Sequence, residues 1–162
     1  MTYLTLKTLH ILSMVLLFGT GLGSAFYKWM ADRSGNVAHI AQTNRQVVLA
    51  DWLFTTPTVI FQPISGLWMV NLLEIPLSTP WVAVSLGLYA LAGVCWLPVV
   101  WLQIRMRDLA QLAASTGQAL PPLYWRMARA WFWLGIPAFS AMVLVVGLMV
   151  FKHIPPLFGG GV

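Results

Sequence analysis

Residues 81–103 read WVAVSLGLYALAGVCWLPVVWLQ and contain no Lys, Arg, Asp or Glu. A run of this length matches the roughly 20 residues that an α-helix needs to cross the hydrocarbon core of a bilayer. The sequence contains four such apolar runs, at about residues 3–30, 51–73, 81–103 and 129–151. We therefore predict an all-α protein, a four-helix transmembrane bundle formed by a single integral membrane domain over residues 1–162.

The composition supports a membrane environment. Hydrophobic residues make up 59% of the chain, charged residues only 8%, and the mean hydropathy is +0.80. This small number of polar side chains cannot cover the surface of a water-soluble globule of this size. We therefore expect the lipid bilayer to surround the protein. The length leaves no room for a soluble catalytic domain, and no nucleotide-binding or hydrolytic motif occurs. These features favour a non-catalytic role over an enzymatic one.

The distribution of basic residues predicts the orientation in the membrane. Most of them lie on the first and third connections between the apolar runs, whereas the opposite side carries only Lys7 and Lys152. The basic residues of those two connections are Lys28, Arg33, Arg45, Arg105, Arg107, Arg126 and Arg129. Cytoplasmic loops of bacterial inner-membrane proteins show this excess. We predict a multi-pass protein of that membrane with both termini on the outer, periplasmic side, and no nucleic-acid partner despite the net charge of +5.

The connections also contain helical sequence. Residues 31–49 predict a short cytoplasmic helix that leads into the second run, and residues 104–114 continue the third helix beyond the membrane until Ser115-Thr116-Gly117 ends it. Pro121 and Pro122 then start the approach to the fourth run. We expect the first run to be a membrane helix and not a cleaved signal peptide, because it is longer than the usual apolar region of such a peptide.

A polar stripe runs along the second apolar segment at spacings of three and four residues, which place side chains on one helix face. It comprises Asp51, Thr55, Thr58, Gln62 and Ser65, and continues to Met69. Lipid-facing positions disfavour polar groups, so this face is predicted to lie inside the bundle. Asp51 has two interpretations, a helix cap paired with a basic residue or a member of a proton relay, of which we favour the first.

Comparable stripes can be traced on the other three segments. They are Lys7, His10, Met14, Leu17, Gly21, Ser24 and Lys28 in the first, Ser85, Tyr89, Ala92 and Trp96 in the third, and Gly135, Phe139, Met142, Val146, Met149 and His153 in the fourth. Prolines interrupt three segments and leave backbone carbonyls unpaired. In the second segment, Thr55, Thr56, Thr58 and Gln62 surround Pro57 and Pro63, and we expect them to satisfy the freed carbonyls locally.

Histidine and methionine recur at the predicted outer end. His10 and Met14 are four residues apart on one helix face, Met149 and His153 repeat the pair, and Met69 lies at the same level. Imidazole and thioether groups suit haem iron or soft copper. All five are therefore candidate cofactor-binding residues, with His10 and His153 as the candidate metal ligands and haem b or copper as the candidate cofactors. The simpler interpretation is apolar filling by methionine and an interfacial polar role for histidine.

Several short sequences resemble a bacterial family of predicted integral membrane proteins of unknown function. They are YLTLKTLHIL at residues 3–12, Thr56-Pro57 and Gln62-Pro63 followed by Ser65-Gly66-Leu67-Trp68, and Pro80-Trp81. More distantly, the first stretch and Gly66-Leu67-Trp68 resemble the HemJ-type protoporphyrinogen oxidases and the membrane domain of copper-resistance protein D. The HemJ resemblance implies a first-helix histidine associated with haem b, matched here by His10. An arginine and a lysine of that type fall on Phe26 and Ser85, so the oxidase reaction itself is not implied.

Three functions follow from these observations. The leading one is haem binding or a redox-linked role through His10. The second is copper handling by the His and Met side chains. The third is a structural subunit or assembly partner, in which the polar stripes hold helices together against a membrane protein partner or in a homo-oligomer.

Overall fold

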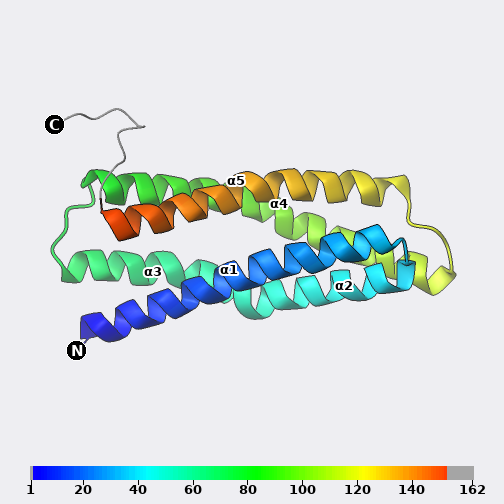
Figure 1. Cartoon of the computed structure of the whole chain (residues 1–162), viewed down its shortest axis with the longest axis horizontal. Coiled ribbons are helices and arrows are strands. Elements are labelled where there is room, and N and C mark those ends of the chain that lie inside the picture. The colour runs from blue at the N-terminus through cyan, green and yellow to red at the C-terminus, as the bar shows by residue number, and fades with distance from the viewer. Residues whose placement is uncertain (1, 153–162) are drawn as a thin grey trace.

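The computed structural model describes residues 2–152, in which all regular secondary structure is helical (Figure 1). The elements are α1 (Thr2–Ser34), α2 (Val37–Ala50), the π-helical turn η1 (Asp51–Thr55), α3 (Thr56–Leu72), α4 (Pro80–Thr116) and α5 (Pro122–Phe151). Because α2, η1 and α3 follow one another without a break, they form one rod. Four rods are thus long and apolar enough to cross a membrane, which confirms the predicted all-α fold with four candidate spans.

The rods are longer than a bilayer is thick. At 1.5 Å per residue, the 37 residues of α4 extend about 55 Å, against about 30 Å for the hydrocarbon core. The excess lies at the basic end, defined here as the end where α1 meets α2 and α4 meets α5 (right in Figure 1). Gly117, with a φ of 67°, terminates α4 where the sequence predicted. Pro122 starts α5 well before the predicted span.

The predicted cytoplasmic helix exists as α2. The side chain of Asn36 caps it by accepting from the backbone N–H of His39 at 3.1 Å. His39 itself is exposed, as expected of a solvated side chain. The start of α1 and the end of α5 lie at the same end of the bundle, at the left of Figure 1. The assignment of this end to the periplasm stays a prediction.

The basic end has a conventional core. Small and apolar side chains of α1, α2 and α4 pack there around Tyr124 of α5, which is fully buried. The core residues are Ala31, Ile40, Ala41, Leu102, Met106, Ala110 and Tyr124. The alanines of this core let α1, α2 and α4 approach closely.

A buried polar network reinforces this core. The Lys28 ammonium, only 1% exposed, donates to Asp32 at 2.8 Å and to the Tyr124 hydroxyl at 3.0 Å. Asn44 of α2 donates to the same hydroxyl at 2.9 Å. The sequence placed Lys28 both among the basic side chains of the first connection and on the interior stripe of the first segment. The structure shows it inside the bundle, where it joins α1 to α5 and its charge is balanced by Asp32.

Away from the basic end, the bundle divides into two helix pairs. Helix α1 packs on α3, and α4 packs on α5, which form the lower and upper layers of Figure 1. Among the described residues, no Cα atom of α1 lies within 8 Å of one in α5, and the same holds for α3 and α4. Side chains bridge the pairs, as where the rings of Phe18 and Phe139 meet at 5.3 Å between centroids. The space between the pairs is therefore available for cavities.

Candidate functional site

His10 lies in the interface between α1 and α3 and is only 5% exposed. Its Nδ1 is 2.7 Å from the hydroxyl oxygen of Ser65, and its Cε1 would lie 3.5 Å from a Cβ atom added to Gly66. A Cβ at position 66 would make only an ordinary contact with the ring, so Gly66 marks where α3 approaches the imidazole. The Ser65-Gly66 sequence thus provides both a hydrogen-bond partner and a close contact for the ring.

The hydrogen bonds around Ser65 assign the tautomer of His10. The Ser65 hydroxyl donates its proton back to its own helix, with the Phe61 carbonyl at 2.7 Å and the Gln62 carbonyl at 3.2 Å. Since a hydroxyl has one proton, it must accept from Nδ1–H of His10. The proton is then on Nδ1, and Nε2 carries a lone pair. That atom is buried and has no hydrogen-bond partner within residues 2–152.

The backbone of His10 is held as well as its ring. Gln62, on the turn before Ser65, donates from Nε2 to the His10 carbonyl at 2.9 Å. Two adjacent members of the polar stripe therefore bind the same residue of α1. This double attachment sets the orientation of the imidazole, as outer-shell hydrogen bonds do for metal-binding histidines.

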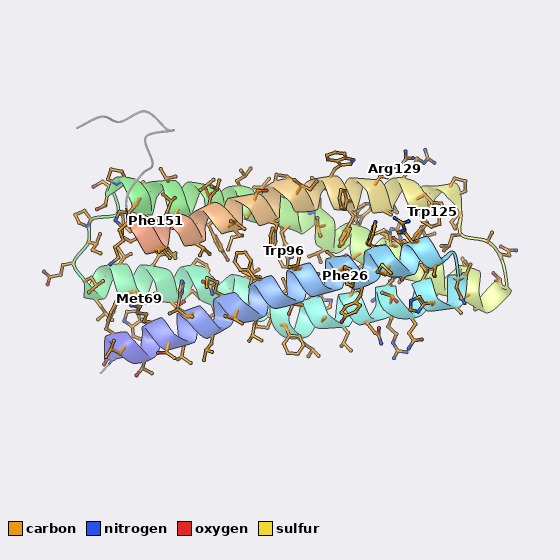
Figure 2. All side chains as sticks on the ribbon, in the orientation of Figure 1. Phe26, Met69, Trp96, Trp125, Arg129 and Phe151 are labelled. Atoms are coloured by element: carbon orange, nitrogen blue, oxygen red, sulfur yellow. The ribbon has the colours of Figure 1, made fainter. Side chains whose placement is uncertain are left out.

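A small cavity of about 70 Å³ adjoins His10, between the two helix pairs. Met14 and Met149 line it with His10, so the structure brings together three of the five candidate ligands. Met142 lines it too, although the sequence had placed it only on the interior stripe of the fourth segment. Met69, labelled in Figure 2, is half-buried on α3 and does not line this cavity. His153 lies outside the described residues.

The predicted interior stripes surround two cavities. All five polar residues of the second segment are buried, as expected. Stripe members of the other segments line the small cavity or a larger one of about 380 Å³ next to it. They are His10, Met14, Leu17, Gly21 and Ser24 of α1, Ser85, Tyr89, Ala92 and Trp96 of α4, and Gly135, Phe139, Met142, Val146 and Met149 of α5. Two described members line neither cavity: Lys7 is exposed, and Lys28 is buried in the core of the basic end.

The favoured interpretation of Asp51 was wrong. Because α2 and α3 form one rod, Asp51 lies in the middle of a helix and caps no N-terminus. No basic side chain of the described chain pairs with it; its carboxylate accepts instead from the Thr55 hydroxyl at 2.8 Å. Asp51 lines the larger cavity. The π-helical turn was not visible in the sequence, although it ends two residues before Pro57.

The carbonyl freed by Pro63 is satisfied from another helix. Pro63 has no N–H for the Val59 carbonyl one turn earlier, and the Tyr89 hydroxyl of α4 donates to that oxygen. Local side chains were expected to donate to this carbonyl. Instead, Gln62 donates to the His10 carbonyl, and Thr58 donates to the Phe54 carbonyl at 2.7 Å. The proline thus creates an acceptor that connects α3 to α4.

Residues 4–153 match a family model described as "Predicted integral membrane protein (DUF2269)". The match covers nearly the whole chain and confirms the resemblance to a family of integral membrane proteins of unknown function. No curated protein and no solved structure matches the chain. The more distant resemblance to the HemJ type and to copper-resistance protein D stays a prediction.

Proposed function

This chain belongs to the DUF2269 family of predicted integral membrane proteins, and we propose that it binds one Cu(I) ion inside the bundle through His10. The observation that carries the proposal is the unpartnered, buried Nε2 of His10 beside a cavity lined by methionines. Imidazole and thioether groups are ligands that Cu(I) prefers. A lone pair buried without a partner costs free energy that a bound ion would recover.

The ligand set favours a soft monovalent ion over a harder one. His10 and Met14 of α1 face Met142 and Met149 of α5 across the small cavity, and these groups are all uncharged when His10 is neutral. Burying a divalent ion among uncharged ligands would cost more than burying Cu(I). Within residues 2–152, no three His, Cys, Asp or Glu side chains gather as a metal site.

Haem b fits the geometry less well. The cavity beside His10, at about 70 Å³, has room for one metal ion or a few water molecules but not for a porphyrin. The larger cavity is not lined by His10. Axial ligation of haem by His10 would therefore require the two helix pairs to move apart.

A structural role is supported by a separate observation. The ring and the carbonyl of His10 both bond to α3, so the residue contributes to helix association whether or not a metal binds. On this alternative, the protein would serve as a subunit or assembly partner in a membrane complex. Replacing His10 would then reduce stability, and copper would have no effect on either form.

Anaerobic titration of the purified protein with Cu(I), in competition with a chromophoric Cu(I) chelator, tests the proposal. We expect one Cu(I) per chain, loss of binding in His10→Ala, and weaker binding in Met14→Leu and Met149→Leu, which keep the side-chain volume but remove sulfur. Met69→Leu is the matched control and should bind normally. Substoichiometric copper, or unchanged affinity in His10→Ala, refutes the copper site. A Soret band after haem loading that disappears in His10→Ala would establish the haem alternative instead.

A further inference from the structure

The larger cavity has the properties of a second, separate binding site. Its volume is about 380 Å³, and it is lined by α1, η1, α3, α4 and α5 between the two helix pairs. Trp96, labelled in Figure 2, lines it from α4. Tyr89 and Met142 line both cavities, so the two adjoin, but neither His10 nor Met149 lines the larger one. It is large enough for a small organic molecule.

One acidic group and no basic group lines this cavity. Asp51 is 6% exposed, the Thr55 hydroxyl bonded to it is uncharged, and so is the Gln103 amide that lines the same cavity. In the described chain, the ion pairs are Lys28 with Asp32 and Arg107 with Asp108. An ionised carboxylate in an apolar hollow is costly unless a cation neutralises it. In its ionised form, Asp51 therefore has no complementary charge among the described residues.

The backbone presents this carboxyl group to the cavity. Asp51 begins the π-helical turn η1, in which the N–H of Thr56 bonds to the Asp51 carbonyl five residues earlier. A single π turn inside an α-helix shifts the following side chains around the axis and is common at functional sites. Thr55, on the next turn, holds the carboxyl group by its hydroxyl.

Aromatic rings form much of the remaining wall. They are Phe18, Tyr89, Trp96, Trp131, Phe132 and Phe139. The faces of such rings attract cations, most strongly where water is excluded. Lys28 lies 5.6 Å from the Trp131 ring but is neutralised by Asp32 and does not line the cavity. Aromatic walls together with one carboxylate complement an apolar molecule that carries a positive charge.

The boundary between α1 and α5 offers a route from the lipid. Their Cα atoms stay more than 8 Å apart in the described chain, and the contact between Phe18 and Phe139 is made by side chains alone. Side-chain rotation is faster and easier than separation of packed helices. An apolar molecule dissolved in the bilayer can therefore enter between these two helices.

We propose that the cavity beside Asp51 binds a lipophilic cation, whose apolar body contacts the aromatic walls and whose positive group pairs with the Asp51 carboxylate. The site is distinct from the Cu(I) site, so either proposal can fail without the other. Asp51→Asn would weaken cation binding and leave copper titration unchanged.

Equilibrium dialysis of the full chain in phosphatidylcholine nanodiscs tests the proposal with tetraphenylphosphonium and tetraphenylborate, which have the same shape and opposite charge. We expect saturable binding of the cation at one per chain and none of the anion. Asp51→Asn should weaken cation binding by at least about tenfold. Asp108→Asn removes the same charge from an exposed residue outside the cavity and should bind normally.

A steric variant makes the test independent of the carboxylate. Gly135 lines the cavity with no atom within 4 Å of an added Cβ, so Gly135→Leu should fill the space and abolish cation binding. Gly147 lies on the same helix with equal room and lines neither cavity, so Gly147→Leu should bind as the native chain does. Equal binding of both ions, or undiminished cation binding in Asp51→Asn or Gly135→Leu, overturns the proposal.

Discussion

The hydroxyl of Tyr124 donates to Oδ1 of Asp32 at 2.6 Å, and this bond connects the start of α5 to the end of α1. The Tyr124 hydroxyl oxygen also accepts hydrogen bonds from Lys28 and from Asn44. One phenol therefore bonds to three other side chains at the basic end. Lys28 is thereby kept as a buried ion pair inside the bundle. The network lies in the buried core of the basic end, so its loss should lower the stability of the whole bundle.

Tyr124→Phe keeps the ring and removes the hydroxyl. It leaves Lys28, Asn44 and Asp32 each short of a partner, and we expect the free energy of unfolding to fall by about 1–3 kcal/mol. Denaturant unfolding in mixed micelles measures the change. Tyr27, which is 66% exposed on α1, gives the matched control Tyr27→Phe, expected to stay within about 0.5 kcal/mol of the native value. Similar losses in both variants would contradict a specific role for the network.

The bond from Tyr89 to the Val59 carbonyl predicts a coupling with Pro63. Tyr89→Phe leaves that carbonyl unpaired and should cost about 1–3 kcal/mol of stability. In a Pro63→Ala background, the new N–H can bond to Val59 within the helix, so Tyr89→Phe should cost much less. A double-mutant cycle on unfolding free energies measures the difference. Equal costs in the two backgrounds would show that the carbonyl does not depend on Tyr89.

Ser65→Ala removes the hydroxyl that orients His10. Nε2 stays available, but the ring loses the bond that holds Nδ1, and we expect Cu(I) affinity to fall about 10–100-fold. The chelator competition assay gives the ratio. Ser85 lines the same cavity and donates to the Trp81 carbonyl at 2.7 Å, so Ser85→Ala is a matched loss of hydroxyl that should leave affinity unchanged. The prediction fails if the two variants bind alike.

Gly66 lies against the imidazole, and its replacements should be graded by size. Gly66→Ala places a Cβ at an ordinary contact distance, 3.5 Å from Cε1 of His10, so copper binding should persist. Gly66→Leu extends into the small cavity and should block binding. Gly147→Leu adds the same volume on α5, outside both cavities, and controls for a general effect of leucine. Copper binding by Gly66→Leu at native affinity would rule out the small cavity as the position of the Cu(I) ion.

The polar stripe was accessible to sequence reasoning, because helical spacing is a local property. The helical period of the second segment predicted that Asp51, Gln62 and Ser65 are buried, and the structure shows them buried. The period did not show what they bind, since those partners come from residues distant in sequence. Ser65 holds His10 across 55 positions of the chain, and Tyr89 reaches Val59 across 30.

The partner of Lys28 and the helical context of Asp51 were missed for the same reason. Lys28 and Asp32 have the four-residue spacing of a helical ion pair, which was the one available signal, yet their burial depends on Tyr124 from α5. Asp51 was assigned to a helix start because nothing in the sequence revealed that α2, η1 and α3 form one rod.

Hydropathy over about 20 residues and the positions of charge were sufficient to establish four apolar helices and the faces they turn inward, because bilayer thickness and helical period act on neighbouring residues. Tertiary structure alone decided that the helices form two pairs joined at the basic end, and that the space between them contains two cavities. It also gave His10 an unpartnered nitrogen and turned Asp51 toward an aromatic hollow. Helix rotation and spacing depend on packing between distant side chains, which periodicity does not specify.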